Sequence, residues 1–293
     1  MCRLFALSAG RNRVYATFWL LEAPDSLAVQ SRAEPDGAGL GAYTTAGKPE
    51  LYRTPKPAYE DAEFTIEAKE IESTTFIAHV RYASTGAVSV ENTHPFEQRS
   101  RLFAHNGVVG DLPKLDHALG DYRNLVHGQS DSERVFALIT REIDRNGGDI
   151  SAAIASAATW IARELPVYAL NLLLATADEV WVLRYPDTHE LFLLERPTGG
   201  THGSRHLEAA SASGRVRVRS SDLAAAPAVI AASERMDEHP DWRELEPGEL
   251  VHIDAELRVE TSIVLDDPPT HQLHLQDLDP HSAASQQPSA GKV

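Results

Sequence analysis

The chain has 293 residues, of which 42% are hydrophobic and 24% are charged, the balance of an ordinary globular protein with enough material for a large core. Its 27 Lys and Arg residues against 43 Asp and Glu residues give a net charge of −16, which disfavours nucleic acid and anionic membranes because both attract basic surfaces. The single cysteine excludes an internal disulfide and is compatible with a reducing compartment.

No segment of the sequence predicts export or membrane insertion. The chain does not open with a charged region, an apolar stretch and a small-residue cleavage site, which argues against a secretory signal. The most apolar run, residues 167–177, is well short of the roughly 20 residues that a membrane helix needs, so we interpret it as a buried strand. We therefore expect a cytoplasmic protein without nucleic-acid or membrane partners.

The first part of the chain predicts short strands separated by turns. Residues 2–8 (CRLFALS) form an apolar run typical of a buried strand. Residues 34–43 (EPDGAGLGAY) are predicted to be rich in turns, because three glycines allow tight turns or close approach of the backbone. Residues 74–84 (TTFIAHVRYAS) and 101–109 (RLFAHNGVV) are apolar and resemble further strands.

Two adjacent helices follow, and then strands return. Residues 130–146 combine Ser130 as an N-cap with Glu133 three residues later, and residues 151–165 are rich in alanine. Further strands are predicted between residues 167 and 265. This order lacks the βαβ alternation of a parallel sheet and favours an α+β layered fold over residues 1–265. Residues 266–293 are polar and are expected to be a disordered or loosely attached tail.

Cys2 is the first candidate for chemistry, because it follows the start methionine directly. A lone cysteine at the start of a strand is most often a small buried hydrophobic residue. Removal of Met1 would instead place its thiol beside a free α-amine, whose pKa of roughly 7.7–8.0 suits proton transfer near neutral pH. One residue would then supply both a nucleophile and its base.

Three further stretches each have an ordinary structural reading and a functional one. Arg81 ends an apolar strand, and its guanidinium is the group best suited to holding a carboxylate by two hydrogen bonds. Asn106-Gly107 is most often a turn, but its neighbouring side-chain and backbone N–H groups would suit an oxyanion. Asp131 near a helix start could stabilise the helix by interacting with its dipole, or it could bind a substrate ammonium.

The order of these motifs is more specific than any one of them. Cys2 followed by R-Y-A-x-x-G, N-x-H-P, H-N-G and S-D-S-E resembles the class II glutamine amidotransferases, whose nucleophile is an N-terminal cysteine. The resemblance implies the Ntn-hydrolase fold, an αββα sandwich of two antiparallel sheets between helical layers. The match departs at Tyr82, where the family often has Trp, and at Ser84, where threonine is common.

The resemblance also implies a role for each site residue. Cys2 would attack the side-chain amide of glutamine or a γ-glutamyl compound, while Asn106 and Gly107 stabilise the oxyanion. Arg81 would bind the substrate α-carboxylate and Asp131 its α-ammonium, and water would release glutamate from the thioester. The resemblance implies further substrate contacts at Ser84 and His94. It implies no cofactor, and the sequence shows no Cys/His spacing of a zinc site.

Three functions stay open at the level of the sequence. The chain is too short for an added synthase domain, so the resemblance favours a stand-alone amidohydrolase that either serves a separate ammonia-accepting synthase or hydrolyses an amide for its own sake. A γ-glutamyl amide hydrolase of an ergothioneine-type pathway is the alternative within the enzyme class. A catalytically silent binding protein on the same scaffold is the third alternative.

Overall fold

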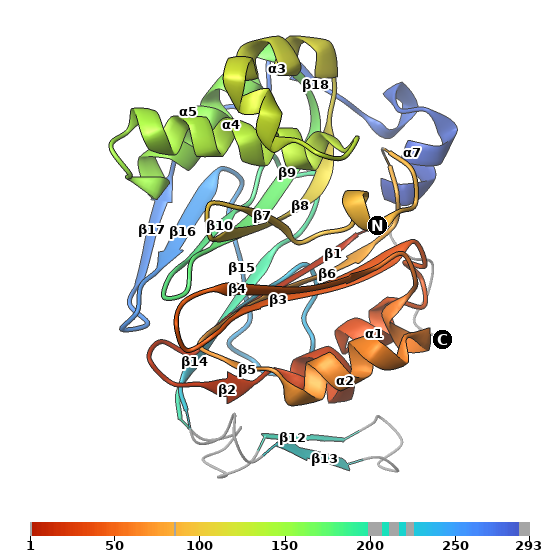
Figure 1. The fold of residues 1–293 in the computed structure, drawn as a ribbon, viewed down its shortest axis with the longest axis vertical. Helices are drawn as coiled ribbons and strands as arrows, with labels where there is room; N and C mark the ends of the chain where they lie inside the picture. The colour runs from red at the N-terminus through yellow and green to blue at the C-terminus, as the bar shows by residue number, and fades with distance from the viewer. Residues whose placement is uncertain (1, 85, 199–206, 211–216, 221–225, 287–293) are drawn as a thin grey trace.

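Two stacked antiparallel sheets form the centre of the molecule in the computed structural model, which describes residues 2–84, 86–198, 207–210, 217–220 and 226–286 (Figure 1). The first sheet has the order β15 (Arg243–Glu244), β11 (Phe192–Arg196), β14 (Ala228–Ala232), β1 (Arg3–Ser8), β6 (Thr75–Arg81), β3 (Gly37–Tyr43), β4 (Pro49–Thr54). The second has the order β17 (Val259–Ile263), β16 (Glu249–Ile253), β10 (Val180–Leu183), β9 (Pro166–Ala175), β8 (Arg101–Val109), β7 (Phe96–Gln98).

Helices cover the outer face of each sheet. The first sheet packs against α1 (Leu27–Gln30) and α2 (Ala62–Glu70), and the second against α3 (Leu112–Leu119), α4 (Asp131–Arg145) and α5 (Ile150–Glu164) (Figure 1). The arrangement is the αββα sandwich that the resemblance implied. The other described strands are the pairs β2 (Val14–Tyr15) with β5 (Glu72–Ser73) and β12 (Leu207–Ala210) with β13 (Arg217–Ser220), and the C-terminal β18 (His271–Gln272). The other described helices are the C-terminal α7 (Pro280–Gln286) and short helices at Phe18–Glu22, Ala58–Glu60, Val90–Asn92, Gly120–Leu125 and Leu275–Asp277.

Strand β1 lies in the middle of the first sheet, paired with β14 on one side and β6 on the other. Side chains alternate across a strand, so Leu4 and Ala6 pack between the two sheets while Phe5 and Leu7 pack under the helices. Both faces of β1 are therefore buried, which explains its unbroken apolar sequence. This placement fixes Cys2, the residue before β1, at the end of a central strand.

Several predictions from the sequence are confirmed. The predicted helices correspond to α4 and α5, and the Ser130 hydroxyl accepts the Glu133 N–H at 3.2 Å, as an N-cap should. The predicted strands at residues 2–8, 74–84 and 101–109 correspond to β1, β6 and β8. Among the described residues, no helix is both long and apolar enough to cross a membrane.

The glycine-rich segment was wrongly predicted to consist of turns, because most of it is strand β3. The expected close approach of the backbone is nevertheless present. A Cβ on Gly39 would lie 2.0 Å from the carbonyl oxygen of His94. The glycine thus lets the His94 segment pass directly over the sheet, and a larger residue would displace that segment.

The predicted disordered tail is ordered over residues 266–286. Strand β18 pairs in parallel with the start of β9, and the Tyr185 hydroxyl donates to the Asp267 carbonyl at 2.9 Å. The Leu273 N–H donates to the Val167 carbonyl at 2.8 Å. Polar composition misled the prediction, because this segment is held mainly by hydrogen bonds to other elements and contributes few side chains to the core. Residues 287–293 lie outside the described residues.

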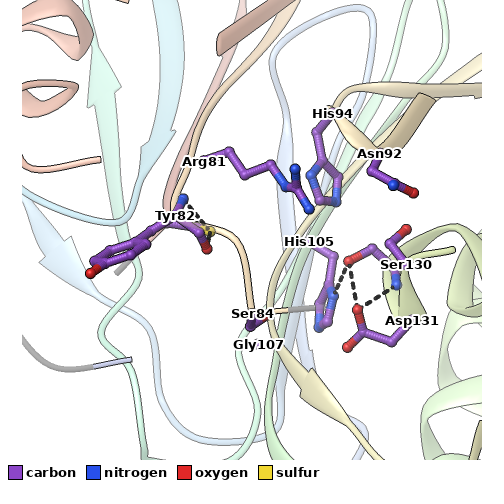
Figure 2. Close-up of a pocket in the computed structure, with 11 residues that line it drawn as sticks. Arg81, Tyr82, Ser84, Asn92, His94, His105, Gly107, Ser130 and Asp131 are labelled. Atoms are coloured by element: carbon purple, nitrogen blue, oxygen red, sulfur yellow. Dashed lines mark hydrogen bonds between the residues drawn. The ribbon is translucent and has the colours of Figure 1, made fainter. Parts of the chain in front are cut away.

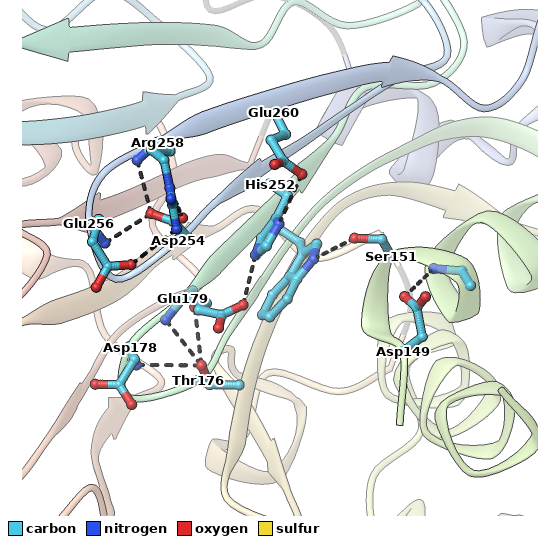
Figure 3. A network of polar contacts seen from close by, with 12 residues as sticks. Asp149, Ser151, Thr176, Asp178, Glu179, His252, Asp254, Glu256, Arg258 and Glu260 are labelled. Atoms are coloured by element: carbon cyan, nitrogen blue, oxygen red, sulfur yellow. Dashed lines mark hydrogen bonds and ion pairs between the residues drawn. The ribbon is translucent and has the colours of Figure 1, made fainter. Parts of the chain in front are cut away.

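A polar network joins the second sheet to α5 at the sheet edge farthest from the N-terminus (Figures 1 and 3). The indole N–H of Trp181 donates to Ser151 Oγ at 2.9 Å, and His252 stacks on the indole with the ring centroids 4.7 Å apart. The other side of His252 contacts Glu179, with 2.7 Å between Nε2 and Oε2. These contacts fasten the helical layer at a distance from the residues that the sequence singled out.

Candidate active site

A cavity of about 20 Å³ lies where the ends of β1, β6 and β8 meet the start of α4, with room for about one water molecule (Figure 2). It brings together six of the seven residues predicted from the sequence. The lining residues are Cys2, Arg81, Tyr82, Ser84, Asn92, His94, His105, Gly107, Ser130, Asp131 and Ser132.

The Cys2 thiol is 8% exposed and sits against the backbone of Tyr82. Its sulfur accepts the Tyr82 N–H at 3.2 Å and lies 3.2 Å from the Tyr82 carbonyl oxygen, to which the S–H can donate. Burial raises the pKa of the Cys2 thiol to about 11, because the charged thiolate loses its hydration. The thiol is therefore neutral near pH 7 and needs a base before it can act as a nucleophile.

Asn106 and Gly107 lie in the middle of β8 and do not form a turn. The strand alternation puts Asn106 on the same inter-sheet face as Leu102 and Ala104, and Gly107 lines the cavity. The Asn106 side chain is fully buried, and neither its oxygen nor its nitrogen has a hydrogen-bond partner among the described residues. A buried amide without a partner is costly in a folded protein, which marks it as a group available to a ligand.

Glycine is required at position 107 by the neighbouring strand. A Cβ at this position would lie 1.9 Å from the Ala169 carbonyl oxygen, closer than any real contact. The backbones of β8 and β9 therefore approach each other where Gly107 lines the cavity. This approach explains in structural terms why Gly follows Asn here.

Arg81 ends β6, and its guanidinium contacts the loop that follows this strand. The structure describes residues 82–84 and 86–88 of this loop, which is called here the substrate loop. One nitrogen donates to the Ala87 carbonyl at 3.1 Å and another to the Gly86 carbonyl at 3.4 Å. The Asn92 amide donates to the same Ala87 carbonyl at 3.1 Å. Arg81 thus anchors the loop beside the cavity, and in Figure 2 its guanidinium points toward His94.

Asp131 is the first residue of α4 and joins that helix to β8. Its carboxylate accepts the Val109 N–H and the Ser132 N–H, both at 2.9 Å. The Ser132 hydroxyl in turn lies 2.9 Å from Nδ1 of His105. The Ser132 hydroxyl also lies 3.3 Å from the Asp131 carboxylate, so Asp131, Ser132 and His105 form one polar cluster on the cavity wall.

The residues that hydrogen-bond to the predicted site residues and their neighbours were not identified from the sequence. Ser84 and His94 line the cavity, and His94 stacks on His79 with the ring centroids 4.2 Å apart. The roles of Ser132 and Asn92 were missed, although both lie inside motifs that the sequence displays. Nothing in a single sequence shows that Ser132 would face His105, 27 residues away along the chain.

Three buried histidines beside the cavity should make the fold sensitive to acid. Burial lowers the pKa of His79 to about 3 and also lowers the pKa values of His94 and His105. Below about pH 6.5 the unfolded chain binds protons on these rings that the folded chain excludes, and for His79 this holds down to about pH 3. We expect the free energy of unfolding to fall with decreasing pH, by up to about 1.4 kcal/mol per pH unit for each histidine.

Urea unfolding at pH 7, 6 and 5 checks this expectation. His79→Gln should reduce the slope of stability against pH, whereas the exposed His127→Gln should leave it unchanged. Equal slopes for wild type and His79→Gln would contradict the assignment of this acid sensitivity to His79.

Arg81→Lys should weaken binding of a substrate carboxylate, because one ammonium cannot replace a planar two-point donor. We expect KM to rise about tenfold or more, the range for losing a hydrogen bond between charged groups. Steady-state kinetics would measure this, with Arg53→Lys as a matched control, since Arg53 contacts the Thr93 carbonyl and does not line the cavity. An unchanged KM would place the carboxylate elsewhere.

Comparison with known proteins identifies the family of this chain. The model of the family "Glutamine amidotransferases class-II" matches residues 1–277. The chain is 28% identical over 266 residues to the gamma-glutamyl-hercynylcysteine sulfoxide hydrolase of Mycolicibacterium smegmatis, covering 86% of this chain and 96% of that protein. It is 29% identical over 170 residues to the probable glutamine amidotransferase DUG3 of Saccharomyces cerevisiae, covering 51% of this chain and 47% of that protein. The chain thus spans about half the length of this yeast relative.

A solved structure extends the likeness to the fold. The glutamine aminotransferase class-II domain protein from Silicibacter pomeroyi superimposes with a TM-score of 0.59 at 21% identity, covering 89% of this chain and 99% of that one. The two proteins share two antiparallel sheets that lie between helical layers. The chain belongs to the class II glutamine amidotransferase family.

Proposed function

We propose that this protein is a stand-alone amidohydrolase that cleaves the side-chain amide of glutamine or of a γ-glutamyl compound through Cys2. The observation that carries the proposal is the convergence of Cys2 and Gly107 on one cavity, with the unpartnered Asn106 amide in the adjacent strand position. Arg81 and Asp131 supply opposite charges on the wall of the same cavity. An α-amino acid carries the complementary pair of charges.

The first half of the reaction would proceed as follows. Removal of Met1 leaves the α-amine of Cys2 free, and this amine takes the proton from the neutral thiol. The sulfur attacks the amide carbon, and the oxyanion accepts hydrogen bonds from the Asn106 side chain and the Gly107 N–H. The amine then returns the proton to the leaving nitrogen. The carbon–nitrogen bond breaks and leaves a thioester on Cys2.

Water completes the cycle by attacking the thioester. The α-amine accepts a proton from this water, the tetrahedral intermediate collapses, and the thiol leaves with that proton. The products are ammonia or an amine and a free γ-carboxylate, which is glutamate for both substrate classes. We place the reaction in the cytoplasm, because a nucleophilic thiol persists in a reducing compartment.

The identity of the amine divides the enzymatic alternatives. Coverage of 96% of a γ-glutamyl-hercynylcysteine sulfoxide hydrolase favours a γ-glutamyl amide with a larger amine as the second candidate substrate. Glutamine itself would release ammonia, which a separate synthase could consume. A silent binding protein would have no use for a buried unpartnered amide beside a cysteine.

Released glutamate is the measurement that tests the proposal. The purified protein is incubated with glutamine and with a panel of γ-glutamyl amides, and mass spectrometry of the intact chain establishes whether Met1 has been removed. We expect glutamate from at least one donor in protein that begins at Cys2. Protein that begins at Cys2 but releases glutamate from none of them would contradict the proposed function.

A further inference from the structure

The C-terminal helix α7 lies beyond residue 277, where the family match ends, yet it reaches the candidate active site. Its buried side chains are polar: Ser282 is 3% exposed, Ser285 is fully buried and Gln286 is 2% exposed. A helix that buries serine and glutamine gains little from the hydrophobic effect. Its position must therefore be determined by specific hydrogen bonds.

One of these bonds joins α7 to the substrate loop. The Ser282 hydroxyl lies 2.8 Å from the carbonyl oxygen of Ser84, a residue that lines the cavity. The two residues are 198 positions apart in the sequence. A second bond fixes the end of the helix, since Gln286 Oε1 lies 2.8 Å from Nε2 of the buried His189.

Ser84 lies two residues after Tyr82, whose N–H donates to the Cys2 sulfur. Ala83 between them donates its N–H to Asp36 Oδ2 at 2.9 Å. Arg81 and Asn92 hold the far end of the substrate loop at Ala87. Among the described contacts, Ser282 is thus the one that fastens the Ser84 carbonyl from outside the loop.

We propose that Ser282 is a positioning residue for the acyl-donor site, which it supports by holding the substrate loop against the cavity through the Ser84 carbonyl. This inference rests on the proposed function for its kinetic consequence. The bond between Ser282 and Ser84 then acts as a strap across the rim of the site. Loss of the hydroxyl would let Ser84 and its neighbours move away from Cys2.

A substitution at Asp279 gives a second variant, which should keep the bond between Ser282 and Ser84 that Ser282→Ala removes. The Ser282 hydroxyl has one hydrogen but two acceptors, Ser84 O and Asp279 Oδ2, the latter at 2.5 Å. In Asp279→Asn the new amide can donate to Ser282 Oγ and leave the hydroxyl hydrogen to Ser84. Asparagine is as good as aspartate at a helix start, so α7 should persist.

Hydrogen exchange of the Tyr82 and Ala83 amides measures the strap directly, without any substrate. We expect Ser282→Ala to speed their exchange about fivefold, the value for losing one net hydrogen bond, while Ser282→Thr restores protection. Asp279→Asn should exchange no faster than wild type. Ser285→Ala is the matched control, because the bonds of its hydroxyl to described residues lie within α7, to the Ser282 carbonyl and the Gln286 side-chain amide.

Kinetics with the best γ-glutamyl donor completes the experiment. Ser282→Ala should raise KM several-fold and change kcat less, whereas Ser285→Ala should leave both unchanged. Exchange and KM that stay at wild-type values in Ser282→Ala would overturn the inference and leave the proposed function standing. A wild type without turnover would overturn the proposed function, while the exchange data would still report on the strap.

Discussion

Cys2→Ala should reduce amide hydrolysis by at least about 10³-fold, because no other residue in the chain carries a thiol. Alanine is small enough for Met1 still to be removed, so the variant keeps the α-amine and loses only the sulfur. The fold should persist, since the side chain is small and its polar contacts among the described residues are with the Tyr82 backbone. Glutamate release and thermal unfolding, measured on the same preparations, check both statements.

Cys2→Ser is the informative companion variant. Its hydroxyl can occupy the place of the thiol but is a much weaker nucleophile when the base is a single amine. Activity should therefore stay well below wild type. Retained turnover in Cys2→Ala, with glutamate produced at the wild-type rate, would remove the cysteine from the mechanism altogether.

Asn106→Ala should lower kcat by about 10²–10³-fold and change KM little, the loss expected for one oxyanion donor. The amide is fully buried without a partner, so its removal leaves no other group unsatisfied and should not destabilise the fold. Steady-state kinetics and the midpoint of thermal unfolding are the two measurements. This combination of a large kinetic loss with an intact fold is the signature of a group that acts on the transition state.

Asn171 offers a matched control on the neighbouring strand, because it pairs with Asn106 where β8 and β9 lie side by side. Its amide donates to the His189 and Glu190 carbonyls, and its oxygen accepts the Tyr185 N–H. Asn171→Ala should therefore cost about 1–3 kcal/mol of stability and spare kcat. The opposite pattern, with Asn106→Ala unstable but fully active, would assign Asn106 a structural role only.

The sequence predicted those elements whose residues carry an unbroken apolar run or a clear apolar periodicity. Strand β1 is such a run, helices α4 and α5 bury regular apolar faces, and the Ser130 cap marks the start of α4. Helix α2 was missed because only Phe64 and Ala68 among its residues are buried. Strand β3 was missed because its glycines were interpreted as turn residues, whereas Gly39 reflects the closeness of the His94 carbonyl, which only the folded chain reveals.

The site residues also divide into those that the sequence could predict and those that it could not. Cys2, Arg81, Asn106 and Asp131 could be named from motif order, which is local information. Their supports could not, since the contacts of Ser132 with His105 and of Ser282 with Ser84 join residues 27 and 198 positions apart. Such contacts depend on which strands meet, and a single sequence does not specify that.

The central position of β1 also bears on how such proteins can diversify. Its partners β14 and β6 hold it on both sides, so the sulfur at its end has almost no freedom to shift without breaking the sheet. New substrate preferences must then arise at the rim, through the loop after β6 and the segment that ends in α7. Evolution can exchange those parts while the attacking atom stays where it is.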